Sequence, residues 1–388
     1  MISHDEGSRS PVGEPFTDRT VDKFASPLLD PDRFGLAVFS SNMAGGANLT
    51  DATGPPRVTW PETVRIAQAA DRHGFDAIIP VARWRSPSTT ERAAAHRSFE
   101  TFTWAAGLAA VTERIGVFAT FHVPTVHPVR AAKEIATVDH ISGGRLGVNV
   151  VAGWNAADFQ MFGFELDEHD DRYGVADEWM EFLERIFEGE HPFDFDGAHF
   201  RSREVVSEPR PVQTPAPVVM SAGFSPAGRA FAARRADINF VITPDRGAAK
   251  TAIAEVKRVA SDVHGRRLSV FGAAHILCRD SDAAAQAEYR RVVHEHGDWA
   301  GARAALASLM GGSQSADFAL EMQEAAIFGF FATPIVGSPD HVVEQLLDMR
   351  ADGLDGAAVS WVDYEEGIEQ YGEVLAPLLA EAGLRPGG

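Results

Sequence analysis

The sequence has almost no cysteine and no long apolar segment, and both absences exclude classes of protein. Cys278 is the only cysteine among 388 residues, so neither a disulfide framework nor a cysteine metal cluster can form. No apolar run reaches the roughly 18 residues of a membrane-spanning helix. The segment 1–20 is polar and does not resemble a secretory signal. We therefore expect a cytoplasmic protein.

Basic residues are also scarce. The chain carries 35 Lys and Arg against 55 Asp and Glu, a formal charge of -20. This balance disfavours nucleic acids and anionic membranes as partners, whereas a small anionic ligand remains compatible with a local positive field. No Gly-x-Gly-x-x-Gly segment follows a strand and no Walker-type phosphate loop occurs.

Two short motifs need a choice between interpretations. The segment Gly223-Phe-Ser225-Pro-Ala227 lacks the last glycine of a nucleophile elbow, which disfavours a serine hydrolase. Ser225 fits a helix N-cap instead, and such a helix start also favours a phosphate. His294 and His296 alternate along an expected helix and do not share a face, so no metal site is expected.

Strands and helices alternate along the chain. Continuous apolar strands of this kind are buried on both faces. With 45% hydrophobic residues, the pattern predicts an α/β fold, a (β/α)8 TIM barrel with insertions after strands 4 and 7, at 152–171 and 282–335. An open doubly wound sheet is the alternative. We expect one domain over 31–388 and a flexible tail over 1–30. The eight expected strands are 34–39, 77–81, 115–121, 145–151, 218–220, 238–242, 268–277 and 357–361.

Functional residues of a barrel lie at the C-terminal ends of its strands. Asn149 is a polar residue inside the apolar fourth strand and must be satisfied by protein or by ligand. Thr120 occupies a similar place in the third strand, so the two side chains should converge. Arg172 follows an acidic run at a helix start, where an arginine is unfavourable unless it meets an anion. Arg83 and Trp84 follow the second strand and suit a ring or an acidic substrate.

Several segments resemble the bacterial luciferase-like FMN-dependent monooxygenases. They are 98–112, His127-Pro128, Ser142-Gly-Gly-Arg145, Gly153-Trp154 and Val336-Gly-Ser-Pro. The resemblance covers about 33–380 and is strongest to the branch with pyrimidine oxygenase and dimethylsulfone monooxygenase. It implies a TIM barrel that binds FMN at its C-terminal face.

The resemblance also implies roles for individual residues. The flavin ring would lie against Val81 and Ala82. Asn149 matches the flavin-binding asparagine, and Asp158 stands where that branch has a glutamate. The FMN phosphate would be held by Arg172, Tyr173 and Ser225. The oxygen pocket would be lined by Ile78, Thr120, Asn149 and Trp154. His122 and Arg83 are not part of the resemblance, and we expect them, from their places after the third and second strands, to contact the substrate or to move a proton.

The implied activity is that of a two-component monooxygenase. A separate NAD(P)H flavin reductase would supply reduced FMN, and O2 would give a flavin peroxide at N5 or C4a that oxygenates a small organic substrate. A heteroaromatic, a sulfone or a halogenated arene would suit. A homo-oligomer, dimer or tetramer, is expected. The segments 83–87 and 121–122 depart from pyrimidine oxygenase, which argues against pyrimidine cleavage. A deazaflavin-dependent hydride-transfer enzyme and a non-catalytic flavin-binding protein are the alternatives.

Overall fold

Eight parallel strands form a closed ring. The computed structural model describes residues 20–52, 54, 56–85, 97–153, 155–163, 165, 169–223, 225–242, 246–309 and 319–385. In order around the ring the strands are β2 (Gly35–Phe39), β3 (Ala77–Ile79), β4 (Gly116–His122), β5 (Leu146–Val151), β9 (Val218–Ser221), β10 (Ile238–Val241), β11 (Ser269–Cys278) and β13 (Gly356–Ser360).

Pairing between β10 and β11 closes the ring. An open doubly wound sheet has two free edges, so this pairing excludes that alternative, and the predicted (β/α)8 TIM barrel is confirmed. β4 and β5 pair with Thr120 opposite Asn149. Parallel neighbours in register point paired side chains to the same face, so the two residues predicted to converge do share a face.

Alternate residues of the strands enter two separate cores. The inner core fills the barrel and includes Ala77 and Ile79 of β3, Phe118 of β4 and Phe271 of β11. The outer core lies between the strands and the surrounding helices and is the larger of the two. Above the inner core, Thr120, His122 and Asn149 continue the inward rows at the C-terminal ends of β4 and β5.

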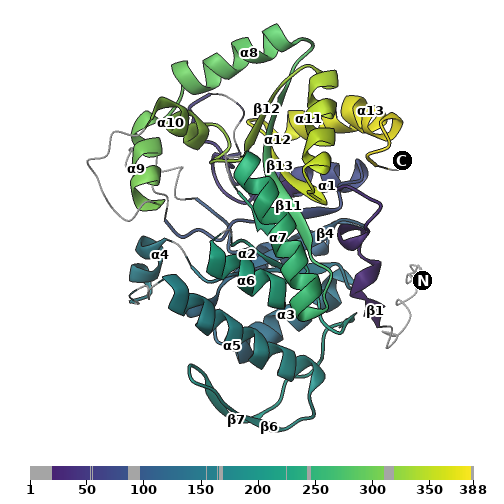
Figure 1. The fold of residues 1–388 in the computed structure, drawn as a ribbon, viewed down its shortest axis with the longest axis vertical. Coiled ribbons are helices and arrows are strands. Elements are labelled where there is room, and N and C mark those ends of the chain that lie inside the picture. Colours follow the sequence, from purple (N-terminus) through teal and green to yellow (C-terminus); the bar gives the residue numbers. More distant parts are fainter. Residues whose placement is uncertain are drawn as a thin grey trace, which may run out of the picture.

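Helices cover the outside of the ring (Figure 1). Those that follow ring strands are α1 (Trp60–Arg72), α2 (Thr101–Ala109), α3 (Pro128–Ser142), α5 (His169–Glu188), α6 (Pro226–Arg235), α7 (Arg246–His264), α11 (Pro339–Ala351), α12 (Tyr364–Gln370) and α13 (Ala376–Glu381). Helix α1 starts with a capping box between Thr59 and Glu62. In the part of the chain described, no helix has the length and apolar character needed to cross a membrane.

Both predicted insertions are present. The insertion predicted at 152–171 contains the short α4 (Ala156–Met161). The hairpin of β6 (Phe193–Asp196) and β7 (Arg201–Val205), and the strand β8 (Gln213–Thr214), lie beyond it, after α5. After β11 come α8 (Asp282–Arg290), α9 (Trp299–Leu309), α10 (Leu320–Ile327) and β12 (Thr333–Gly337). β12 pairs with the C-terminal half of β11 outside the ring. The sequence pattern does not predict this strand. Helices α8 to α10 have a small core of their own and lie at the upper left in Figure 1.

The expected flexible tail does not extend over residues 20–30, because these residues pack against the barrel. β1 (Val21–Asp22) pairs with β8. Leu28 and Leu29 are buried in the inner core at the N-terminal end of the barrel. The Lys23 ammonium lies 3.0 Å from Asp237, and both side chains are buried. The remainder of the predicted tail lies outside the described residues.

Candidate active site

A large cavity opens at the C-terminal ends of the strands. Its volume is about 1010 Å3, and it extends from the barrel mouth to the insertion after β11. Eight of the residues singled out from the sequence line it. They are Val81, Ala82, Thr120, His122, Asn149, Arg172, Tyr173 and Ser225. The structure therefore brings together most of the predicted site, although the residues come from the ends of β3, β4, β5 and β9 and from α5.

Asn149 and Thr120 form a polar pair on the cavity wall. The Thr120 hydroxyl donates to the carbonyl of Pro80 at 2.9 Å, and the Asn149 amide nitrogen lies 3.4 Å from the Thr120 oxygen. The Asn149 Oδ1 atom is buried and accepts no hydrogen bond from the described protein. Because an unsatisfied buried acceptor costs about 1–3 kcal/mol, this atom is suited to accept a hydrogen bond from a ligand.

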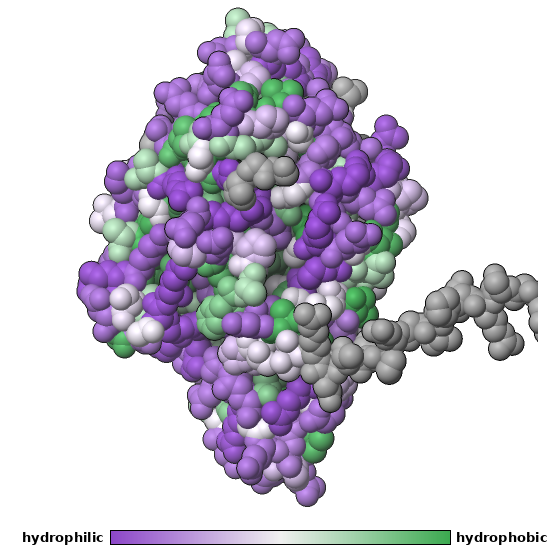
Figure 2. Space-filling model, turned by 90° about the vertical axis from the view of Figure 1, so that its right-hand side faces the viewer, coloured by the Kyte–Doolittle hydropathy of each residue, from purple (hydrophilic) through white to green (hydrophobic). Residues whose placement is uncertain are grey.

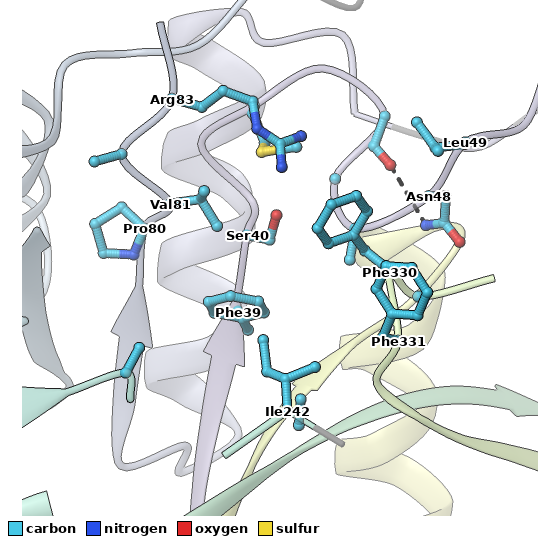
Figure 3. Close-up of a pocket in the computed structure, with 18 of the residues that line it drawn as sticks. Phe39, Ser40, Asn48, Leu49, Pro80, Val81, Arg83, Ile242, Phe330 and Phe331 are labelled. Carbon is cyan, nitrogen blue, oxygen red and sulfur yellow. Dashed lines mark hydrogen bonds between the residues drawn. The ribbon is translucent and has the colours of Figure 1, made fainter. Parts of the chain in front are cut away.

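Val81 and Ala82 follow β3 and are held in place by Asn42. The Asn42 amide nitrogen donates to the Val81 carbonyl, and the Val81 N–H donates to Asn42 Oδ1, both at 2.9 Å. This double hydrogen bond replaces a strand pairing where β3 ends and leaves the Val81 side chain on the cavity wall (Figure 3). Sequence reasoning missed Asn42, because it lies in a polar loop with no periodic pattern.

The start of α6 forms a cradle at one end of the cavity. Ser225 caps this helix by accepting a hydrogen bond from the Gly228 N–H at 3.1 Å. Gly223 and Gly228 approach so closely that a Cβ atom on Gly228 would lie 2.7 Å from the Tyr173 hydroxyl and 2.8 Å from the Gly223 Cα. Pro226 has no N–H and the Arg229 N–H donates to the Ser225 carbonyl at 2.8 Å, so the Ala227 N–H and the helix dipole are what favour an anion here.

Arg172 lies on the helix preceding this cradle, in α5. Its side chain donates to the Gly153 carbonyl at the end of β5. The Nε atom is buried and has no hydrogen-bond partner in the described protein. A guanidinium with a free donor beside a helix start is suited to bind a phosphate. The role of Arg172 as an anion ligand stays a prediction, which this placement permits.

His122 lines the cavity at the end of β4 and is 4% exposed. Burial and, to a smaller extent, the positive charge of Arg83 lower its pKa to about 4. The imidazole is therefore neutral near neutral pH, and its buried Nδ1 atom has no hydrogen-bond partner in the described protein. It can exchange a hydrogen bond with a ligand but does not contribute charge there.

Asp158 lies on α4 and supports the loop after β3 without lining the cavity. Its carboxylate accepts a hydrogen bond from the Arg85 N–H at 2.8 Å. Burial raises its pKa, and backbone hydrogen bonds from Arg85 and Trp84 oppose that shift. In this structure Asp158 therefore positions the Arg83–Arg85 segment, whereas the resemblance implies a flavin contact.

The two remaining residues expected in the site, Ile78 and Trp154, are not found in the cavity wall described. Ile78 is fully buried in the outer core, among residues that face the helices. Its neighbours Ala77 and Ile79 face the barrel interior, so Ile78 does not line the cavity. Trp154 lies outside the described residues.

The alternatives drawn from short motifs do not form sites. The Ser225 hydroxyl accepts from the Gly228 N–H, as a helix cap does. His294 stacks on Trp299 and lies 3.7 Å from Glu324, within the insertion after β11. Among the described residues, no group of three or more His, Cys, Asp or Glu side chains is arranged to hold a metal.

The arrangement fits an elongated ligand with a phosphate at one end and a flat polar ring at the other. The α6 cradle and Arg172 suit the phosphate. The Val81–Ala82 segment and the free Asn149 oxygen suit the edge and face of the ring. These are the requirements of FMN, and the residues present meet them.

Comparison with known proteins agrees with this fit. The family model of the luciferase-like monooxygenases matches residues 35–356. The chain is 27% identical to the FMNH2-dependent dimethylsulfone monooxygenase of Pseudomonas putida, over 89% of this chain and 95% of that protein. It is 32% identical to the pyrimidine monooxygenase RutA of Cronobacter turicensis, over 81% of this chain and 84% of that protein.

A solved structure of riboflavin lyase, with a modified FMN and the substrate riboflavin, has the same fold. The TM-score is 0.79 at 22% identity, and the match covers 92% of this chain and 93% of that one. The family model and the curated relatives each span most of the chain. The chain belongs to the luciferase-like monooxygenase family.

Proposed function

We propose that this protein is the oxygenating component of a two-component monooxygenase that uses reduced FMN and O2. The observation that supports this most strongly is the unpaired, buried Asn149 Oδ1 in a cavity that also has a phosphate cradle. A relative at 27% identity is named FMNH2-dependent, which supports both the cofactor and its reduced state on arrival. A separate NAD(P)H flavin reductase would then be the partner.

Arg172, Tyr173 and Ser225 would hold the FMN phosphate. The Ser225 cap keeps the first turn of α6 regular, and the Ala227 N–H and the positive end of the helix dipole would then face the anion. The hydrogen bond from Arg172 to the Gly153 carbonyl links this cradle to the end of β5. The phosphate end and the ring end of the site are therefore fixed to the same strand.

Reduced FMN, when bound, supplies the electrons with which one atom of O2 enters the substrate and the other leaves as water. The protein orients the ring through Val81, Ala82 and the Asn149 oxygen. Thr120 holds the Asn149 amide, and this polar pair is preorganised because Thr120 is anchored on Pro80. His122 is neutral and adds a hydrogen-bonding group near the substrate without adding charge.

The substrate would be a small organic molecule such as a heteroaromatic, a sulfone or a halogenated arene. The deazaflavin-dependent alternative keeps the fold, but the relatives at 27% and 32% identity are monooxygenases. A non-catalytic flavin-binding role is not favoured by any observation on the site. We therefore keep oxygenation as the proposed reaction.

The test is anaerobic binding of reduced FMN followed by mixing with O2. We expect stoichiometric binding of reduced FMN and a rate of flavin reoxidation that differs from that of free reduced FMN, because the site excludes water and holds the ring. Deazaflavin coenzyme serves as the comparison cofactor. Reoxidation at the rate of free flavin, or preference for the deazaflavin, would contradict the proposal.

A further inference from the structure

The cavity has a second part beyond the residues suited to FMN. Pockets for one drug-sized ligand measure about 300–1000 Å3, and this cavity, at about 1010 Å3, is at the upper limit. The additional space lies between the loop after β2 and the insertion after β11. We call it the distal chamber, and its walls are formed by Met43, Leu49, Arg83, Met322, Phe330 and Phe331.

Two consecutive phenylalanines in the distal chamber have a strained backbone. Phe330 has a φ of 48° and Phe331 a φ of 69°, and both follow Gly329 at 83°. A bulky residue in the left-handed region is a true outlier, and each costs of the order of 1–3 kcal/mol. The Phe331 N–H is held by the Ala325 carbonyl at 2.9 Å. Such strain is typical of ligand clamps.

The strained turn places an aromatic wall opposite the expected flavin ring. Figure 3 shows Phe330 and Phe331 across the cavity from Pro80 and Val81. The two phenylalanine rings are 5.3 Å apart at 63°. Glycine is required at position 329 for two reasons. Its φ is positive, and a Cβ atom added there would lie 2.5 Å from the Cβ of His275. The turn therefore presents a fixed aromatic surface to whatever lies against the flavin.

Arg83 extends over this wall from the loop after β3. Its guanidinium carbon lies 5.1 Å from the centroid of the Phe330 ring, and Figure 3 shows it pointing into the cavity. The Ser98 hydroxyl fixes its backbone by donating to the Arg83 carbonyl at 2.6 Å. Burial lowers the pKa of Arg83 to about 10, with the negative charge of Asp158 opposing the shift. The side chain is therefore a cation near neutral pH.

The charge around the distal chamber is opposite to that of the whole molecule. Arg57 and Arg97 also line the cavity and are exposed, whereas the described acidic residues on its wall are Asp51 and Asp298. Asp298 is engaged at the start of α9, where it accepts the Gly301 N–H at 2.8 Å. In a chain of charge -20, a cleft lined by arginines attracts anions locally.

We propose that the distal chamber binds a planar aromatic substrate that carries a carboxylate, with its ring against Phe330 and Phe331 and its carboxylate on Arg83. This deepens the proposed function, because the substrate would lie between the aromatic wall and the flavin. The chemistry follows from the three features together. Stacking on the phenylalanines selects a flat ring, and the arginine selects the anionic group.

The test compares three probes that differ in one property each. Binding to the FMN-loaded protein is measured by calorimetry with 2-naphthoate, with the neutral 2-naphthamide, and with the anionic but non-aromatic decalin-2-carboxylate. We expect 2-naphthoate to bind about tenfold or more tightly than either of the others, the change for one charge-assisted hydrogen bond or one stacked ring.

Variants assign the two effects to residues. Arg83→Gln should remove the preference for naphthoate over naphthamide, and Phe330→Leu should reduce the preference for naphthoate over the decalin acid. Arg85→Gln is the matched control, because Arg85 is an exposed arginine two residues away that does not line the cavity. It should change neither preference, and FMN affinity should be unchanged in all three variants.

The outcomes separate this proposal from the proposed function. If FMN binds but the three probes bind alike, or naphthoate does not bind, the distal chamber proposal is wrong and the flavin site stands. If Arg83→Gln and Arg85→Gln weaken naphthoate equally, the effect is general charge and the proposal is also wrong. Failure of FMN itself to bind contradicts the proposed function and the placement of substrate against it.

Discussion

The proposed flavin site depends most on Asn149. Its role predicts that the protein binds reduced and oxidised FMN with different affinities. Its free Oδ1 atom can accept a hydrogen bond from a ring N–H, and reduced flavin has one more such donor than oxidised flavin. Asn149→Ala should therefore weaken binding of reduced FMN about three- to tenfold and that of oxidised FMN less. Anaerobic and aerobic fluorescence titrations measure both. Equal losses would contradict a specific contact with the reduced ring.

Arg172 can be tested with a ligand that lacks the phosphate. Its unpaired Nε atom lies beside the α6 cradle, so Arg172→Gln should weaken FMN binding roughly tenfold to hundredfold, as expected for a charged hydrogen bond. Riboflavin has the same ring without the phosphate, and its affinity should stay unchanged. A variant that loses affinity for both ligands equally would place Arg172 away from the phosphate.

His122 should make the protein sensitive to acid. Its pKa is about 4 in the folded protein and about 6.5 in the unfolded chain. Between these values the unfolded state binds more protons, so the free energy of unfolding falls as pH decreases from about 6.5 towards 4. For one such histidine the loss at about pH 5 is roughly 2 kcal/mol.

Urea unfolding at about pH 7 and about pH 5 measures this effect. His122→Asn should lose less stability between the two conditions than the unsubstituted protein does. His275 is buried as well, and burial lowers its pKa to about 3, so His275→Asn should act in the same direction. The exposed His199 provides a control. An unchanged pH dependence in His122→Asn would contradict the prediction.

The sequence identifies some site residues and misses others for a clear reason. Asn149 is polar inside an apolar strand, and Arg172 is basic at a helix start, so each is conspicuous against its local pattern. Asn42 is an asparagine in a polar loop, where nothing distinguishes it. Ile78 belongs to a three-residue strand that is buried on both faces, so its pattern cannot show that it faces the helices.

At the scale of elements, the packing of α5 against the start of α6 determines the shape of the phosphate cradle. A methyl group on Gly228 would lie 2.7 Å from the Tyr173 hydroxyl. Gly228→Ala should therefore weaken FMN binding and destabilise the protein, although alanine is normally favoured in helices by about 0.5–1 kcal/mol. FMN titration and urea unfolding measure the two effects.

Gly174 is the matched control for this prediction. It lies in α5, and an added Cβ would meet nothing within 4 Å. Gly174→Ala should therefore leave FMN affinity unchanged and raise the free energy of unfolding by up to about 1 kcal/mol. If the two alanine variants behaved alike, the close approach at Gly228 would not matter for the site.

The motif Ser142-Gly-Gly-Arg145, one of the segments that carry the family resemblance, stabilises the fold and does not line the cavity. Gly143 ends α3 in the left-handed conformation. The Arg145 guanidinium donates to the carbonyls of Ala109, Thr112 and Ile115 at 2.7–3.1 Å, at the N-terminal end of the barrel. This arginine ties α2, β4 and β5 together at the end opposite the cavity.

The order and bounds of the barrel strands follow closely from the sequence, because buried apolar runs between helices have few alternatives. β12 does not follow, since Thr333–Gly337 contains Pro334, and a proline in a strand pattern argues against a paired strand. The strand tolerates this proline because it pairs with β11 on one side only. Its position depends on the insertion core, which local patterns do not specify.

At the scale of the whole molecule, the two ends of the barrel have separate tasks. The N-terminal end is closed by residues 20–30, where Lys23 lies 3.0 Å from both oxygens of the Asp237 carboxylate. Lys23→Ala removes one partner of a buried pair, although Arg266 remains 3.2 Å from Asp237. We expect the free energy of unfolding to fall by about 1–3 kcal/mol.

FMN affinity should not change in Lys23→Ala, because the cavity lies at the other end of the strands. Urea unfolding and FMN titration of the same sample measure both quantities. A variant as stable as the unsubstituted protein would show that residues 20–30 are not needed to close the barrel. A loss of FMN affinity at full stability would contradict the separation of the two ends.

The charge around the cavity differs in sign from the net charge of the molecule. The surface is mainly hydrophilic on the face shown in Figure 2, with small scattered hydrophobic patches. The net charge of -20 follows from the composition alone, and it disfavours polyanionic partners. The composition does not predict that arginines surround the cavity, because only the fold brings Arg57, Arg83 and Arg97 together.

We infer that the cavity at the C-terminal ends of the strands holds FMN. A crystal structure of the protein with FMN bound tests it most directly. We expect the phosphate within hydrogen-bond distance of Arg172 and the start of α6, and the Asn149 oxygen at the edge of the ring. A flavin bound outside this cavity, or a phosphate that touches neither Arg172 nor α6, would contradict it.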